Sequence, residues 1–172
     1  MADLRSNFAG IKSPNPFWLA SAPPTDKEYN VVRAFKAGWG GVVWKTLGEA
    51  GPPIVNVNGP RYGAIHGADR RLLGLNNIEL ITDRPLKVNL DEITAVKKAW
   101  PDRALVVSLM VPCTEQAWKD ILQKVEQTGC DGVEAEQVGA FAQPIELQVP
   151  VALDARVRSD ATHVCIDVRR HH

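Results

Sequence analysis

The chain has 172 residues, of which 45 % are hydrophobic and 23 % charged, and its 20 Lys and Arg residues balance its 20 Asp and Glu residues. This is the composition of one ordinary globular domain, and a net charge of zero gives no reason to expect nucleic acid or an anionic membrane as a partner. No apolar run approaches the roughly 18 residues of a membrane span. The amino terminus lacks the layout of a signal peptide, so a cytoplasmic location is expected.

The first part of the chain predicts one strand–helix–strand unit. The apolar run 15–21 suits a strand that is covered on both faces. Thr25 and Glu28 fit a capping box that opens a helix, and Gly38 ends that helix. The run 40–46, Gly-Gly-Val-Val-Trp-Lys-Thr, predicts a second buried strand, although a lysine ammonium is unfavourable inside a protein without a partner.

A long insertion follows at residues 47–75, rich in glycine and proline and with little helical pattern. We predict irregular structure here, apart from a short hairpin strand at 54–58, Ile-Val-Asn-Val-Asn. So long an insertion in a compact domain is often functional.

The rest of the chain predicts two further helix–strand units. Asn89 is expected to cap a helix over 90–100, which leads to a strand over 104–110. Thr114 is expected to cap a helix over 115–129, before a fourth strand that begins within 131–136. Strands and helices that alternate in this way are typical of a parallel α/β protein, and the lack of a Gly-x-Gly-x-x-Gly turn favours a (β/α)8 barrel over a dinucleotide-binding fold.

Four separated segments, in the same order and spacing, resemble the flavin-binding catalytic barrel of the dihydropyrimidine dehydrogenases. They are NPFWLASAPPT, AFKAGWGGVVWKT, LNNIELITDR and SLMVPC. The likeness is greatest to the catalytic subunit of the NAD-dependent members, and the dihydroorotate dehydrogenases are similar at a greater distance. The resemblance covers residues 3–134 and implies that 1–136 form the N-terminal half of a (β/α)8 barrel, about four parallel strands with their helices, followed by an unmatched tail at 137–172.

The resemblance implies that FMN carries out the interconversion of uracil or thymine and their 5,6-dihydro forms, with NAD as the final electron partner. Ser21, Lys45 and Thr46 match positions that contact FMN, and Asn77 matches an asparagine that hydrogen-bonds the pyrimidine. An ammonium suits the negative charge of a reduced flavin, and a carboxamide both donates and accepts, as the edge of uracil requires. The residues alone leave three alternatives open: Lys45 reaching solvent, Ser21 as a turn residue, and Asn77 bonding local backbone.

The resemblance stops in the tail. The family continues with a strand that ends in Asn-x-x-Cys-Pro-His and supplies the acid cysteine, but none of Cys113, Cys130 and Cys165 stands at a matching position. The catalytic residue is therefore unknown, and the three cysteines are expected to be reduced thiols without a metal site. The strands that would carry the flavin phosphate site are missing, and iron–sulfur clusters and NAD are expected only in a full complex with a partner subunit.

Three hypotheses follow for the whole chain. The first is a truncated dihydropyrimidine dehydrogenase whose tail, 137–172, comes from a shifted reading frame or a different gene end. The second is a dihydroorotate dehydrogenase, and the third is a catalytically inactive fragment that serves as an assembly module. A half barrel exposes two sheet edges, so oligomerisation is expected unless the tail pairs back on the sheet as an extra strand.

Overall fold

The computed structural model describes residues 2–48, 60, 62–77, 80–112 and 114–136, together with the backbone of 158–160 and 163–167. Four parallel strands form its centre in the order β3-β4-β7-β8. Their bounds are Trp18–Leu19 for β3, Gly41–Leu47 for β4, Ala104–Met110 for β7 and Gly132–Glu136 for β8.

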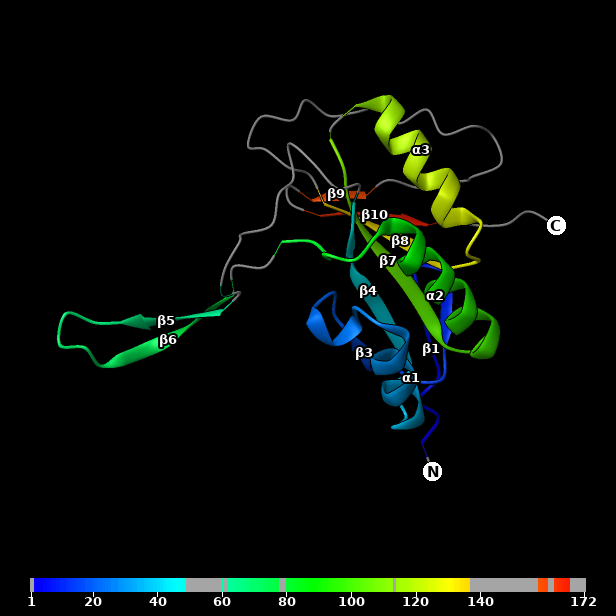
Figure 1. Cartoon of the computed structure of the whole chain (residues 1–172). Coiled ribbons are helices and arrows are strands. Elements are labelled where there is room, and N and C mark those ends of the chain that lie inside the picture. The colour runs from blue at the N-terminus through cyan, green and yellow to red at the C-terminus, as the bar shows by residue number, and fades with distance from the viewer. Residues whose placement is uncertain are drawn as a thin grey trace.

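Three helices alternate with these strands and follow one another along the sheet (Figure 1). They are α1 (Glu28–Lys36), α2 (Leu86–Ala99) and α3 (Glu115–Glu126). The fold class is therefore α/β, and the four parallel strands with three helices match a part of a (β/α)8 barrel, as predicted.

The hydrophobic core lies between the sheet and the helices. The central strands β4 and β7 are buried over nearly their whole length, which is the pattern of parallel strands covered on both faces. Each helix buries an apolar stripe in the same cluster. The buried helical residues are Val31 and Phe35 of α1, Ile93 and Val96 of α2, and Trp118, Ile121 and Val125 of α3.

The first parallel strand is shorter than predicted. Of the run 15–21, only Trp18–Leu19 pairs with β4, because the side chain of Asn15 bonds the backbone of Gly38 and Phe17 and bends the chain before the strand. An antiparallel hairpin, β1 (Ser6–Phe8) and β2 (Ile11–Ser13), precedes it. Its Ser13 hydroxyl accepts a hydrogen bond from the indole of Trp18 at 3.0 Å, which joins the hairpin to the sheet.

Helix α1 begins later than predicted. Thr25 belongs to a 3₁₀ turn, η1 (Pro23–Thr25), where its hydroxyl accepts a hydrogen bond from the Ala22 amide at 3.2 Å. The Glu28 amide at the start of α1 instead donates to the carboxylate of Glu92 in α2, at 2.8 Å. The capping box predicted for Thr25 and Glu28 is therefore wrong, because a carboxylate from a neighbouring helix takes its place.

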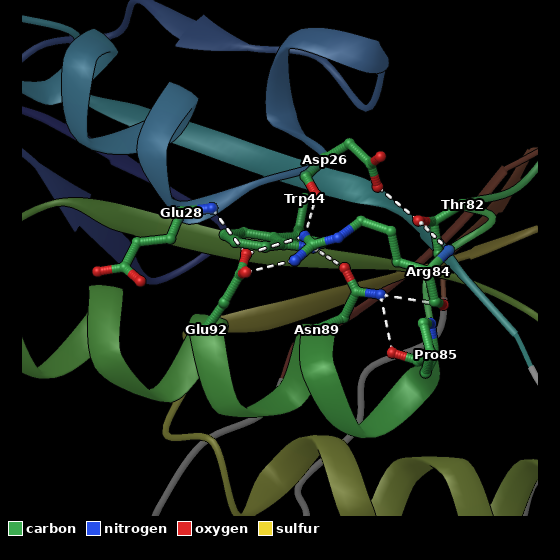
Figure 2. Close-up of polar contacts among 8 residues, drawn as sticks. All are labelled: Asp26, Glu28, Trp44, Thr82, Arg84, Pro85, Asn89 and Glu92. Carbon is green, nitrogen blue, oxygen red and sulfur yellow. Dashed lines mark hydrogen bonds and ion pairs between the residues drawn. The ribbon is translucent and has the colours of Figure 1, made fainter.

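Helix α2 also differs from the prediction, since it begins at Leu86 and contains Asn89 in its second turn. Asn89 is fully buried and does not cap a helix that starts at 90. Its carboxamide oxygen accepts a hydrogen bond from the indole of Trp44 at 3.1 Å, and its amide nitrogen donates to the carbonyls of Arg84 and Pro85 (Figure 2). The helix packs on β4 through this polar contact as well as through its apolar stripe.

The insertion is more regular than predicted. An antiparallel hairpin, β5 (Tyr62–His66) and β6 (Leu72–Asn77), projects away from the sheet as an arm (Figure 1). The strand predicted at 54–58 lies outside the described residues.

The tail returns to the sheet. Strand β10 (His163–Asp167) pairs antiparallel with β8, and β9 (Arg158–Asp160) pairs with β10. The alternative in which the tail adds a strand to the sheet is therefore the one observed, while residues 137–157 and Cys113 lie outside the described residues. No helix in the described ranges has both the length and the apolar character that crossing a membrane requires.

Candidate functional site at the carboxyl edge of the sheet

A β-bulge places two polar side chains at the carboxyl end of β4. Trp44 pairs with Val107 and Leu47 with Leu109, so that Lys45 and Thr46 stand opposite one residue of β7. Bulges interrupt the alternation of a strand and redirect side chains, often beside functional sites. Both side chains are buried here, Lys45 with 4 % and Thr46 with 2 % of its surface exposed.

Three hydroxyl groups from three neighbouring strands meet beside this bulge. The Thr46 hydroxyl lies 3.1 Å from that of Ser21, just after β3, and 3.0 Å from that of Ser108 in β7. The Thr46 amide also donates to the Ser21 hydroxyl at 3.1 Å. A row of hydroxyls can donate or accept in either direction, so the group can adapt to a polar ligand.

The Lys45 ammonium is the charged part of the site. It donates to the carbonyl of Leu80 at 2.8 Å, and no carboxylate within the described part of the chain pairs with it. The alternative in which Lys45 reaches solvent is wrong, because the side chain is buried. A cation in such a place has exchanged water for little compensation, and it therefore favours an anionic ligand.

The predicted residues do not all come together. Ser21, Lys45 and Thr46 lie at one edge of the sheet, at the bulge and the strand beside it. Asn77 ends β6 in the projecting arm, opposite Tyr62, and its side chain is exposed. Its role toward a pyrimidine stays a prediction.

Ser108 was not predicted as a site residue. The signal was a single hydroxyl in an otherwise apolar run, Ala-Leu-Val-Val-Ser-Leu-Met, where a fully buried polar group needs a hydrogen-bond partner. That partner is Thr46, 62 positions earlier in the chain. Nothing in the sequence alone pairs the two residues, because the pairing depends on the register of β4 and β7.

The donor set fits the polar edge of an isoalloxazine ring, the tricyclic part of FMN. Such an edge presents carbonyl oxygens and ring nitrogens and becomes negatively charged on reduction, which an ammonium and adjacent hydroxyls complement. Lys45, Thr46 and Ser21 are the residues that would hold it.

The fold and the site together define an α/β protein with a buried cation and a row of hydroxyls at the carboxyl edge of a parallel sheet, where such proteins bind ligands. No family model matches the sequence. Two curated relatives do match it. The chain is 41 % identical over 137 residues to a chloroplastic dihydropyrimidine dehydrogenase (NADP(+)) of Arabidopsis thaliana, which covers 77 % of this chain and 32 % of that relative.

The second relative is the PreA subunit of the NAD-dependent dihydropyrimidine dehydrogenase of Escherichia coli. It is 36 % identical over 132 residues, which covers 77 % of this chain and 31 % of the subunit. The chain thus spans about a third of the length of the curated relatives it matches. It is homologous to a portion of the dihydropyrimidine dehydrogenases, which are oxidoreductases, and the resemblance that its four segments predicted is confirmed.

Proposed function

We propose that this chain forms the amino-terminal part of an FMN site for the interconversion of uracil or thymine and their 5,6-dihydro forms. The observation that carries the proposal is the Lys45 ammonium, 4 % exposed at the bulge of β4 and bonded to a backbone carbonyl. The homology to dihydropyrimidine dehydrogenases adds the reaction class.

Each site residue has a part in this proposal. Lys45 holds the anionic edge of the ring, while Thr46 and Ser21 orient that edge through hydrogen bonds and keep the ammonium from turning elsewhere. Asn77 takes the pyrimidine by donating and accepting at once. FMN, when bound, supplies the hydride transfer, and the residue that protonates the pyrimidine is not assigned to this chain.

The proposal also includes partners. NAD is the final electron partner of the complete enzyme, and a subunit that carries NAD and iron–sulfur clusters passes the electrons between them. The name of the Escherichia coli relative describes it as a subunit of an NAD-dependent enzyme, which supports a partner of this kind. The complete enzyme is expected in the cytoplasm.

The proposal is tested by titrating the purified chain with FMN and following the flavin absorbance and fluorescence. We expect binding, and we expect Lys45→Met to weaken it roughly 10- to 100-fold, because a hydrogen bond to a charged group contributes about 1.5–3 kcal/mol. The matched control is Lys87→Met, which removes the same charge from an exposed position on α2 and is expected to leave the affinity unchanged.

Two results would contradict the proposal. One is a wild-type chain that neither binds FMN nor gains thermal stability from it. The other is an equal loss of affinity in Lys45→Met and Lys87→Met, which would assign the effect to overall charge.

A further inference from the structure

The short segment from Leu80 to Arg84 lies against the carboxyl end of β4. Its Leu80 carbonyl accepts the hydrogen bond from the Lys45 ammonium at 2.8 Å. Two residues later, the Thr82 amide donates to the Thr46 carbonyl at 2.9 Å. The position of the ammonium is therefore tied to the position of this segment.

Side chains from three parts of the chain hold the other end of the segment (Figure 2). The Arg84 guanidinium forms a two-pronged ion pair with the Glu92 carboxylate of α2, and it also donates to the Asp26 carbonyl. The Thr82 hydroxyl donates to the Asp26 carboxylate and accepts a hydrogen bond from the Arg84 amide at 3.2 Å. The segment is thus fixed to α2 and to the turn before α1 at the same time.

Glu92 stands at the centre of this network. The same carboxylate oxygen that faces Arg84 accepts the amide of Glu28, so it also fixes the first turn of α1. The two side chains of the pair are only 19 % and 23 % exposed. Arg84 holds the pKa of the Glu92 carboxyl below its ordinary value, so the pair stays charged at neutral pH. A two-pronged pair in a partly buried place fixes geometry more strongly than an exposed one.

We propose that the Arg84–Glu92 ion pair positions Lys45, because it fixes the segment 80–84 and with it the Leu80 carbonyl that holds the ammonium at the carboxyl edge of the sheet. The inference rests on the proposed function in one respect, that the ammonium is held there for FMN. Arg84 and Glu92 are positioning residues, since they act through Leu80 and Thr82.

The test measures how fast acetic anhydride acetylates Lys45 in the flavin-free chain, read by mass spectrometry of the digested protein. Lys45 is expected to react slowly in the wild type, since it is buried and hydrogen-bonded. Glu92→Gln removes the negative half of the ion pair while keeping the size of the side chain. We expect it to raise the acetylation rate of Lys45 by about tenfold or more, because the segment 80–84 opens more often.

The control variant is Asp91→Asn, the preceding residue on α2, whose ion pair with Lys87 is exposed on the surface. It removes the same charge and is expected to leave Lys45 protected. The internal reference is Lys97, which is bonded to Asp131 at 2.7 Å at the far end of α2 and reports general loosening of the fold. Its acetylation is expected to stay unchanged in both variants.

A second variant, Thr82→Ala, cuts the tie between the segment and Asp26 but keeps the ion pair, and it decides the test if Glu92→Gln does not fold. The inference is overturned if Lys45 stays protected in the folded variants that break this network, or if its acetylation rises only together with that of Lys97. Failure of the proposed function looks different: a wild-type chain that does not bind FMN contradicts that function, whatever the acetylation of Lys45 shows.

Discussion

Thr25 and Asn89 are residues of the types that usually cap helices, and both make contacts that a local pattern does not reveal. The Thr25 hydroxyl bonds the backbone of its own turn. The Asn89 carboxamide satisfies the buried indole of Trp44. A buried donor without a partner costs about 1–3 kcal/mol, so a polar residue in a core is retained where it supplies that partner. Residue type alone therefore indicates a hydrogen bond, and the fold selects which one.

Cys130 is the thiol of the three whose surroundings the structure describes. Its sulfur lies 3.8 Å from the Val125 carbonyl, and burial raises its pKa to about 11 from an ordinary value of 9.0. We predict that iodoacetamide alkylates it at pH 8 about a hundredfold more slowly in the folded chain than in urea, because only the thiolate reacts. Mass spectrometry of the Cys130 peptide measures this rate separately from those of the other cysteines.

The same shift sets the sign of the pH dependence. Folding keeps the thiol protonated, so its contribution to stability is complete below pH 9 and is lost as the pH rises toward about 11. Rapid alkylation of Cys130 in native buffer at pH 8 would contradict the prediction.

At the scale of the element, strand β4 shows how close packing limits the sequence. Gly41 pairs with Trp18 of β3 and Ala104 of β7. A Cβ atom on Gly41 would lie 2.7 Å from the Ala104 Cβ and 2.9 Å from the Trp18 ring. Glycine is therefore needed here because the neighbouring strands leave no space for a side chain.

We predict that Gly41→Ala lowers the free energy of unfolding by about 1–3 kcal/mol, the usual range for overpacking a core. Guanidinium unfolding followed by tryptophan fluorescence measures it. Gly74→Ala is the matched control, because a Cβ there meets nothing within 4 Å, and a change within about 0.5 kcal/mol is expected. Equal effects of the two substitutions would show that strand propensity, and not packing, accounts for the loss.

At the scale of the whole molecule, the two edges of the sheet and the projecting arm are the features that bear on assembly. Strand β10 covers the outer edge of β8, so one of the edges that a half barrel would expose is paired. The arm instead presents apolar side chains to solvent, among them Leu72, Leu73 and Leu75, which are 58–75 % exposed. An isolated two-stranded hairpin is marginally stable, and exposed apolar patches often mark interfaces.

We therefore keep the expectation of oligomers and assign it to the arm, with a second copy of the chain as the partner. Size-exclusion chromatography with light scattering is expected to show a species larger than 18.9 kDa. The double variant Ile65→Thr, Leu75→Thr is expected to shift it toward the monomer, because threonine keeps strand propensity but removes apolar surface. A wild-type chain that is a monodisperse monomer would contradict this prediction.

Much of the fold was predictable from short stretches of sequence. The strand predicted at 104–110 has the observed bounds, and Thr114 accepts the amide of Ala117 as a helix cap should. The helix end at Gly38 is confirmed by its positive φ of 101°. These features depend on residues a few positions apart, so a local pattern suffices. The hairpin β5–β6 was missed because its strands lack the alternation of polar and apolar residues that a half-buried sheet imposes.

The candidate site divides in the same way. The order and type of the polar residues at strand ends, Ser21, Lys45 and Thr46, can be read from the chain and from its likeness to a family. The contacts that make them a site cannot, because the bulge at Lys45 and Thr46, the bond to Ser108 and the Leu80 carbonyl join positions 35 to 62 apart. Such contacts exist only after the strands have paired in register, since pairing brings residues together without regard to their distance along the chain.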